Sequence, residues 1–420
     1  MKIKQAAIGI VGASLALGLA GCGGSNSGDQ SGASGGKSGS SERANQMYTW
    51  VSNESDREQW ETFISGVQEN GDPDFSITLE GPTFQEYWTL AKTRMAASDA
   101  PCILTTQAAR AQELGSLLAP LDDLAKEAGL DLGQYNQAMM QGMTVDGTVR
   151  AIPYDAEPML MYFNRDMFKA AGLEDPSVNY TTEQFISDAK ALTDGDVYGT
   201  SVGPDLTYPY LPFSFANGHA PVKDGELDLT NPDFVKDVQQ VMDMVSVDGI
   251  SSAPNPSDND EVSRQNFLAG KIGIIVDGPW FYSTIKDGAS FDVGIAVPPS
   301  NSGDSIGLIQ GSGFGIAESC PDKEAAFANI MKMTTPEVVG YVGEHRGTVP
   351  SIDSALDAWA TGKPEADVEV VKALLANGLP LVTTPTWNQV VTQFQQYSPE
   401  GARGDRTAQD ILESIEKSVG

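Results

Sequence analysis

The chain has 420 residues, of which 40% are hydrophobic, and this is more than one apolar core normally holds. Its 57 acidic residues outnumber its 26 Lys and Arg residues, so the formal net charge is −31 at pH 7. Such a surface repels phosphate backbones, and we therefore expect no nucleic-acid partner.

Residues 1–21 have the pattern of an export signal. A basic start is followed by the apolar residues 6–19, a stretch too short to span a bilayer well. The run "LAGC" that ends at Cys22 resembles the lipobox of bacterial lipoproteins. This resemblance implies a signal peptide cleaved before Cys22 and a lipid on Cys22 that anchors the protein, outside the cytoplasm, to the cell membrane. An ordinary secretory peptide with an incidental cysteine is the alternative.

Residues 22–45 are dominated by Gly and Ser and cannot bury enough apolar surface to fold, so we predict a flexible tether. Hydrophobic patterning begins at Met47 and continues to the C-terminus without another low-complexity break. A globular region of this length is expected to form two lobes.

Strands and helices alternate from the start of the globular region. We predict strands at 47–51, 75–79 and 103–106, and helices at 56–69, 84–97 and 108–118. After Pro153 the alternation resumes with "MLMYFNRDMFKAAG", a strand followed by a helix that Gly172 ends. This order is typical of a parallel sheet covered by helices.

A buried strand is predicted at 272–276, within "NFLAGKIGIIVDGPWFY". Gly278 and Pro279 break regular structure, so Trp280 and the two rings after it lie just past the strand end. Ligands of α/β folds bind at such strand ends, which makes Trp280 a candidate contact.

Several short motifs follow one another in a fixed order: "AIPY" at 151–154, "YFNRD" at 162–166, "FKAAG" at 168–172 and "GPW" at 278–280. Their order and spacing resemble those of extracellular solute-binding proteins of the maltose-binding type. The resemblance covers essentially the whole chain. It implies a two-lobed α/β fold like that of periplasmic binding proteins of type II, in which each lobe is a mainly parallel sheet flanked by helices.

The same resemblance implies three chain crossings between the lobes, which we place near 153–157, 304–310 and 345–349. Lobe one would then hold residues 46–153 with 308–346, and lobe two would hold residues 154–307 with 347–420. The ligand would bind in the cleft between them, and the lobes would close around it by a hinge.

Tryptophans near strand ends suit a sugar ligand, because an indole gives the C–H faces of a pyranose an apolar partner. Trp50 and Trp280 each follow a predicted strand, and Trp387 lies in "TTPTWNQ", which resembles the ligand-facing turn near the family's C-terminus. Trp88 follows the second predicted strand. For this residue, a position in the core and a contact with the ligand are equally open alternatives. Trp60 and Trp359 lie on helical patterns, and we expect them in the core.

Polar candidates are assigned by position. Glu157 aligns with a carboxylate at the family's first crossing, and carboxylates accept paired hydrogen bonds from vicinal hydroxyls. Thr106, Gln107 and Arg110 follow the third strand, where no aromatic ring stands. Ser312 lies between two glycines, where bare backbone can approach a ligand closely. For each of these, an ordinary loop or surface position is the alternative.

An enzyme is not favoured. "GDSIG" at 303–307 matches the nucleophile elbow of hydrolases, but a Ser/Gly loop precedes it and a strand pattern follows, whereas the elbow needs a strand and then a helix. The chain has only two histidines, so a zinc site of the usual composition is not expected either. We predict no catalytic residue, no cofactor and no metal.

We therefore predict a monomeric binding protein that captures an oligosaccharide and delivers it to the membrane permease subunits of an ABC importer. A lipid-anchored glycan hydrolase is the alternative from another class. Within the binding class, a peptide or a polyamine is the alternative ligand.

Cys102 and Cys320 are the cysteines left once Cys22 is lipidated, and an exported protein can carry a disulfide. In the family that the chain resembles, the strand returning from lobe two lies antiparallel beside the third strand. The resemblance therefore implies that Cys102, at the start of one strand, faces Cys320, at the end of the other. We predict a disulfide between them, with two unpaired buried thiols as the alternative.

Overall fold

The computed structural model describes residues 42–420. The predicted signal peptide, the lipidation site Cys22 and most of the predicted tether lie outside the described residues. Residues 42–45, which we predicted as the end of the tether, belong to the folded protein: Ala44 is buried, and its carbonyl accepts a hydrogen bond of 3.0 Å from Asn329 Nδ2.

Lobe one is built on a five-stranded sheet with the order β2-β1-β3-β15-β6. The strands are β1 (Gln46–Tyr48), β2 (Thr78–Glu80), β3 (Ile103–Gln107), β6 (Ala151–Pro153) and β15 (Ser312–Ile316). β15 runs antiparallel to both of its neighbours, and β1, β2 and β3 are parallel to one another. This is the arrangement of β3 and β15 that the family resemblance predicted.

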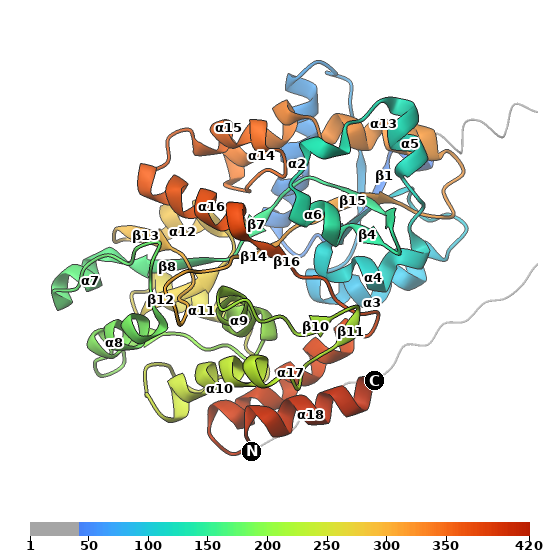
Figure 1. Ribbon diagram of the computed structural model, residues 1–420. Coiled ribbons are helices and arrows are strands. Elements are labelled where there is room, and N and C mark those ends of the chain that lie inside the picture. Colours follow the sequence, from blue (N-terminus) through green and yellow to red (C-terminus); the bar gives the residue numbers. More distant parts are fainter. Residues whose placement is uncertain (1–41) are drawn as a thin grey trace, which may run out of the picture.

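Helices pack around this sheet in the upper right of Figure 1. They are α2 (Glu54–Glu69), α3 (Phe84–Met95), α4 (Ala111–Leu114), α5 (Asp122–Ala128), α6 (Gln137–Gly142), α13 (Lys323–Met333) and α14 (Pro336–Arg346). Short turns η1 (Ala108–Arg110), η2 (Gly115–Leu117) and η3 (Leu132–Gln134) and the small hairpin β4 (Thr144–Val145) and β5 (Thr148–Val149) complete the lobe.

The helix predicted at 108–118 is broken into η1, α4 and η2. Gly115 stands where α4 ends, and a Cβ atom there would come within 2.9 Å of Val145 Cγ1. The close approach of the β4–β5 hairpin therefore requires glycine at this position, and glycine weakens the helix.

Lobe two is built on a four-stranded sheet with the order β13-β8-β12-β9. The strands are β8 (Leu160–Asn164), β9 (Tyr198–Thr200), β12 (Ile272–Asp277) and β13 (Val293–Ala296). β8 is antiparallel to β12 and β13, whereas β9 is parallel to β12. Each lobe thus has one strand that runs against the others.

Most of the helices of lobe two lie in the lower left of Figure 1. The lobe contains α7 (Arg165–Ala171), α8 (Thr182–Leu192), η4 (Leu206–Tyr210), α9 (Leu211–Ala216), α10 (Pro232–Ser246), α11 (Asp260–Leu268), η5 (Pro279–Phe281), α12 (Tyr282–Gly288), α16 (Glu365–Asn377), α17 (Trp387–Ala402) and α18 (Ala408–Val419), with a hairpin of β10 (Val222–Lys223) and β11 (Glu226–Leu227). The predicted helix stop is confirmed: Gly172 ends α7 in the left-handed conformation, with φ of 72°.

A small third sheet joins the lobes. It has the order β16-β14-β7 and consists of β7 (Glu157–Pro158), β14 (Leu308–Gln310) and β16 (Leu379–Pro380). β7 and β14 are antiparallel, and an isolated bridge pairs Asp155 with Pro350. Three distant segments of the chain therefore run side by side between the lobes.

Each large sheet has its own hydrophobic core. Trp60 is buried in the first core and Trp359 in the second, as predicted. The segment after α14, with η6 (Asp353–Ala355) and α15 (Leu356–Ala360), contributes to both cores, because Ile352 and Ala355 pack in the first and Leu356 packs in the second.

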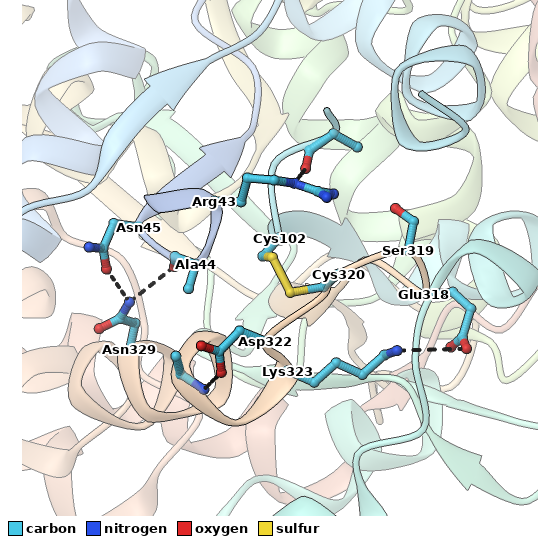
Figure 2. Close-up of a disulfide and its surroundings, with 12 residues drawn as sticks. Arg43, Ala44, Asn45, Cys102, Glu318, Ser319, Cys320, Asp322, Lys323 and Asn329 are labelled. Atoms are coloured by element: carbon cyan, nitrogen blue, oxygen red, sulfur yellow. Dashed lines mark hydrogen bonds and ion pairs between the residues drawn. A yellow bond between two sulfur atoms is a disulfide. The ribbon is translucent and has the colours of Figure 1, made fainter. Parts of the chain in front are cut away.

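The structure contains the predicted disulfide. Cys102 precedes β3 and Cys320 follows β15, their Cα atoms are 4.9 Å apart, and both side chains are buried. Figure 2 shows the bond beside Arg43 and Ala44, and the Cys102 N–H donates to the Arg43 carbonyl at 3.1 Å. The crosslink thus lies where the described part of the chain enters lobe one.

No helix within residues 42–420 is long enough and apolar enough to cross a membrane.

Candidate functional site

The site is built where strands of both lobes end beside the third sheet. β3 ends at Gln107, β12 ends at Asp277, and β7 begins at Glu157. Direct contacts show that the two lobes meet there: Thr383 Oγ1 of lobe two donates to the Ala109 carbonyl of lobe one at 2.8 Å. The two lobes therefore contact each other beside the third sheet, and the predicted candidates around it are not equally exposed.

The lobe-one wall is a cluster of aromatic rings. Trp50 lies 5.3 Å from Phe84 and 6.0 Å from Trp88, measured between ring centroids. Trp50 is 6% exposed and Trp88 is 3% exposed, whereas Phe84 is 37% exposed. Packing covers both predicted tryptophans, and the sequence analysis missed Phe84, the ring of this cluster that faces solvent.

Two buried polar atoms in this region, one of them in Trp88, have no hydrogen-bond partner among the described residues. They are Trp88 Nε1 and Thr106 Oγ1. Thr106 lies on β3, opposite Gly313 of β15, and the half-buried Gln107 is paired with Ser312. A buried polar atom without a partner is costly, so these atoms are candidates to bind a ligand hydroxyl or a water.

Two buried carboxyl groups, those of Asp155 and Glu157, lie at the first chain crossing. They contact residues at the second and third crossings. Asp155 Oδ1 accepts a hydrogen bond of 2.5 Å from the Ser312 N–H, and Glu157 Oε2 accepts one of 3.3 Å from the Val349 N–H. Burial raises the pKa of both carboxyl groups well above the usual range, and the nearby Asp155 raises the pKa of Glu157 further. Glu157 Oε1 is buried and has no partner within the described part of the chain.

Arg110 is held by neighbours in both lobes. Its Cζ lies 5.1 Å from the centroid of the Trp88 ring, and its Nη1 is 3.5 Å from Glu113 Oε2. Nη1 also donates to Asn388 Oδ1 of lobe two at 3.0 Å. Burial lowers the pKa of the guanidinium. The predicted ligand contact is thus engaged with protein groups.

The lobe-two wall is charged. Arg264 Nε donates to Asp277 Oδ2 at 2.9 Å, Arg264 Nη2 donates to Asp260 Oδ2 at 2.6 Å, and the guanidinium stacks on the Phe281 ring at 3.3 Å from its centroid. Burial raises the pKa of Asp277 to about 6, although the neighbouring Arg264 opposes the change. Sequence reasoning missed this group, because charge pairs between a helix and a strand have no local pattern.

Trp280 differs from the other predicted tryptophans because it is half-buried. It lies in η5, directly after β12, and its ring covers Gly278 so closely that a Cβ atom there would be 2.2 Å from the indole. One face of the ring therefore packs on backbone. Trp387, by contrast, is buried in the second core at the start of α17.

A recess of about 10 Å³ opens in the lobe-two wall. Its lining includes Asp205, Tyr208, Asn259 and Asp260, and sequence reasoning proposed none of these. A volume of this size holds about one water molecule, so the recess alone cannot hold an oligosaccharide. A second cavity, of about 360 Å³, is lined by charged groups at the opposite end of β1 and β2, where Arg94 forms ion pairs with Glu80 and Asp99.

The segment that matches the nucleophile elbow in sequence does not have the elbow's strand–turn–helix geometry. The "GDSIG" segment lies in a loop that β14 follows, and Ser305 Oγ has no hydrogen-bond partner among residues 42–420. His219 Nδ1 is instead 2.6 Å from Asp237 Oδ2. The described residues also contain no group of three His, Cys, Asp or Glu side chains that could hold a metal ion.

Comparisons with known proteins agree with this geometry. The family described as "Bacterial extracellular solute-binding protein" matches residues 52–340. The maltodextrin-binding protein MdxE of Bacillus subtilis is 23% identical over 300 residues, which are 68% of this chain and 70% of that protein. Two proteins of Brucella abortus that carry the name "Putative binding protein" are also 23% identical, over 275 residues that are 61% of this chain, and the chain spans 64% of their length.

Solved structures share the fold at low identity. An ABC substrate-binding protein from Listeria monocytogenes in complex with cycloalternan has a TM-score of 0.78 and 20% identity, over 89% of this chain and 97% of that one. UgpB from Mycobacterium tuberculosis in complex with glycerophosphocholine has a TM-score of 0.76 and 20% identity, over 89% and 96% of the two chains.

Proposed function

The chain belongs to the bacterial extracellular solute-binding proteins, and on that basis we propose that it captures an oligosaccharide between its two lobes and delivers it to the permease subunits of an ABC importer. Membership of this family implies a location outside the cytoplasm. The curated and structural relatives named above are binding proteins, so we further propose that this chain has no enzyme activity.

The observation that carries the proposal is the unpaired Oε1 of Glu157 at the first crossing. A carboxyl oxygen buried between two lobes needs a hydrogen-bond partner, and a sugar hydroxyl, which can donate or accept, supplies one. Thr106 Oγ1 and Trp88 Nε1 add polar atoms without partners on the lobe-one side. The half-buried indole of Trp280 offers the apolar surface that a pyranose face requires.

Of the contacts predicted from the sequence, we propose Trp280 and Glu157 as the central pair, with Thr106, Gln107 and Ser312 beside them. Trp50, Trp88 and Trp387 would act mainly as packing behind the site, because they are buried. The lobes would divide near residues 153, 307 and 346 and move about the third sheet. Opening at this hinge would admit the ligand, and ligand contacts with both lobes would favour closure.

Thermal stabilisation against a panel of plant, milk and starch oligosaccharides tests the proposal. We expect at least one glycan to raise the melting temperature and to remain intact by mass spectrometry. Release of shorter products would instead indicate a glycan hydrolase. If no glycan stabilises the protein, the oligosaccharide proposal fails.

A cationic ligand is the second candidate, because the formal net charge of the chain is −31 at pH 7 and such a surface attracts cations. Spermidine and a basic peptide therefore belong in the same panel. Stabilisation by either of them, and by no glycan, would favour this candidate.

We also propose the lipid anchor on Cys22. In a bacterial host, the wild-type protein should sediment with membranes and carry a lipid mass on its first peptide. Cys22→Ala should abolish that mass and release the folded protein. A wild-type protein that carries no lipid would contradict the anchor but leave the binding proposal standing.

A further inference from the structure

Two segments proposed as ligand contacts touch each other across the lobes. One is the turn η1 that follows β3, and the other is the run from Thr383 to Asn388 that leads into α17. Arg110 Nη1 donates to Asn388 Oδ1 at 3.0 Å, and Thr383 Oγ1 donates to the Ala109 carbonyl at 2.8 Å. These two bonds join the lobes at adjacent residues of η1 through protein groups alone.

The lobe-one half of this contact is held in place by lobe one itself. The Arg110 guanidinium stacks against Trp88 and is 3.5 Å from Glu113, which Lys92 Nζ fixes in turn at 2.7 Å. The side chain of Arg110 is only 11% exposed. Because its position is set before the lobes meet, little rotamer freedom is lost when Asn388 arrives.

The lobe-two half is equally well supported. The Ala109 side chain lies within the second hydrophobic core, and Trp387, directly before Asn388, is buried in the same core. The Asn388 amide therefore sits at the first turn of a helix that is anchored by its neighbour. Separating the lobes would break both hydrogen bonds and withdraw Ala109 from that core.

From these contacts we propose that Arg110 and Asn388 form a latch between the lobes that stabilises their closed arrangement independently of the contacts made by a ligand. A contact present only in the closed state shifts the open–closed equilibrium toward closure by its full differential free energy. Arg110 then acts as a positioning residue that sets how often the site opens, rather than as a ligand contact.

Paired spin labels test the latch in the ligand-free protein. Gln85→Cys on α3 and Glu261→Cys on α11 place one label on each lobe, at exposed positions, and labelling without reductant leaves the native disulfide intact. We expect the otherwise unchanged protein to populate a measurable short interlobe distance beside the long one. Asn388→Ala should raise the ratio of long to short distances about tenfold, the effect of losing one hydrogen bond to a charged group.

Control variants separate the latch from general destabilisation. Gln396→Ala, exposed on the same helix α17, should leave the distances unchanged. Arg110→Gln should resemble Asn388→Ala, and the double variant should open the lobes no further than either single change.

The latch is overturned if Asn388→Ala lowers the melting temperature but leaves the distance distribution unchanged, or if Gln396→Ala opens the lobes equally. Neither result depends on a ligand, so this proposal and the oligosaccharide proposal can fail separately.

Discussion

The two walls of the site are made of different chemistry. Lobe one presents packed aromatic rings, with Trp50 and Trp88 buried among their neighbours, whereas lobe two presents the Arg264 charge cluster and the half-buried Trp280. A tryptophan after a strand end is therefore not enough to predict a ligand contact. What differs is whether a following helix supplies rings that cover it, as α3 does for Trp50.

The disulfide provides the largest expected difference between the lobes. It crosslinks lobe one across 218 positions of sequence, and on the chain-entropy model a loop of this length stabilises the folded state by up to about 5 kcal/mol. Replacing both Cys102 and Cys320 by Ala should lower the unfolding temperature of lobe one more than that of lobe two. Differential scanning calorimetry of the variant, and of the wild-type protein with reductant, measures the unfolding temperatures of the two lobes. Equal shifts of both lobes would contradict it.

Trp50→Ala and Trp280→Ala form a matched pair. Removing the buried Trp50 ring should cost about 3–5 kcal/mol of unfolding free energy, because it leaves a cavity in the aromatic cluster. Trp280→Ala should cost less stability and weaken glycan binding by at least about tenfold, since it removes a stacking surface. Denaturant unfolding and calorimetric titration measure the two effects. A large stability loss with unchanged affinity for Trp280→Ala would mean that both tryptophans only pack.

The charged wall should make stability depend on pH. The pKa of Asp277 is raised by burial to about 6 in the folded protein, above the 3.8 of an exposed aspartate. The folded state therefore binds more protons than the unfolded state, so this group's stabilisation is complete below about pH 4 and is lost as the pH rises through 6. The contribution is roughly 1–3 kcal/mol.

Asp277→Asn should flatten the unfolding free energy between about pH 4 and 6, measured by denaturant titration at several pH values. Asp196→Asn, an exposed aspartate of lobe two, is the control and should keep the wild-type slope. An unchanged slope for Asp277→Asn would contradict the assignment to Asp277.

The smallest effect is expected at the surface. Arg403 and Asp405 form an ion pair of 3.0 Å, and both side chains are largely exposed. Asp405→Ala should change the unfolding free energy by less than about 0.5 kcal/mol, because solvent screens such pairs. A larger loss in chemical denaturation would show that the loop between α17 and α18 depends on this pair.

Much of the fold could be predicted from local pattern. The strand at 272–276, the helix that Gly172 ends and the core positions of Trp60 and Trp359 follow from apolar periodicity and from glycine. The disulfide followed from a family resemblance in strand order. The recess residues Asp205 and Tyr208 could not be predicted this way, because an aspartate or a tyrosine in a loop carries no periodic signal.

By itself, then, the sequence determined the order of strands and helices at the start of the globular region, that the chain has two lobes, and which residues stand at the ends of strands such as β12. These depend on the spacing of apolar side chains and on residues that break helices, and both are properties of short segments. Only the tertiary structure decided which of those residues are buried or paired and which remain partly exposed. Trp50 is covered by Phe84 and Trp88, Arg110 is paired with Asn388 from far along the chain, and Trp280 keeps part of its ring exposed. Burial and pairing between distant segments arise only when the lobes pack together.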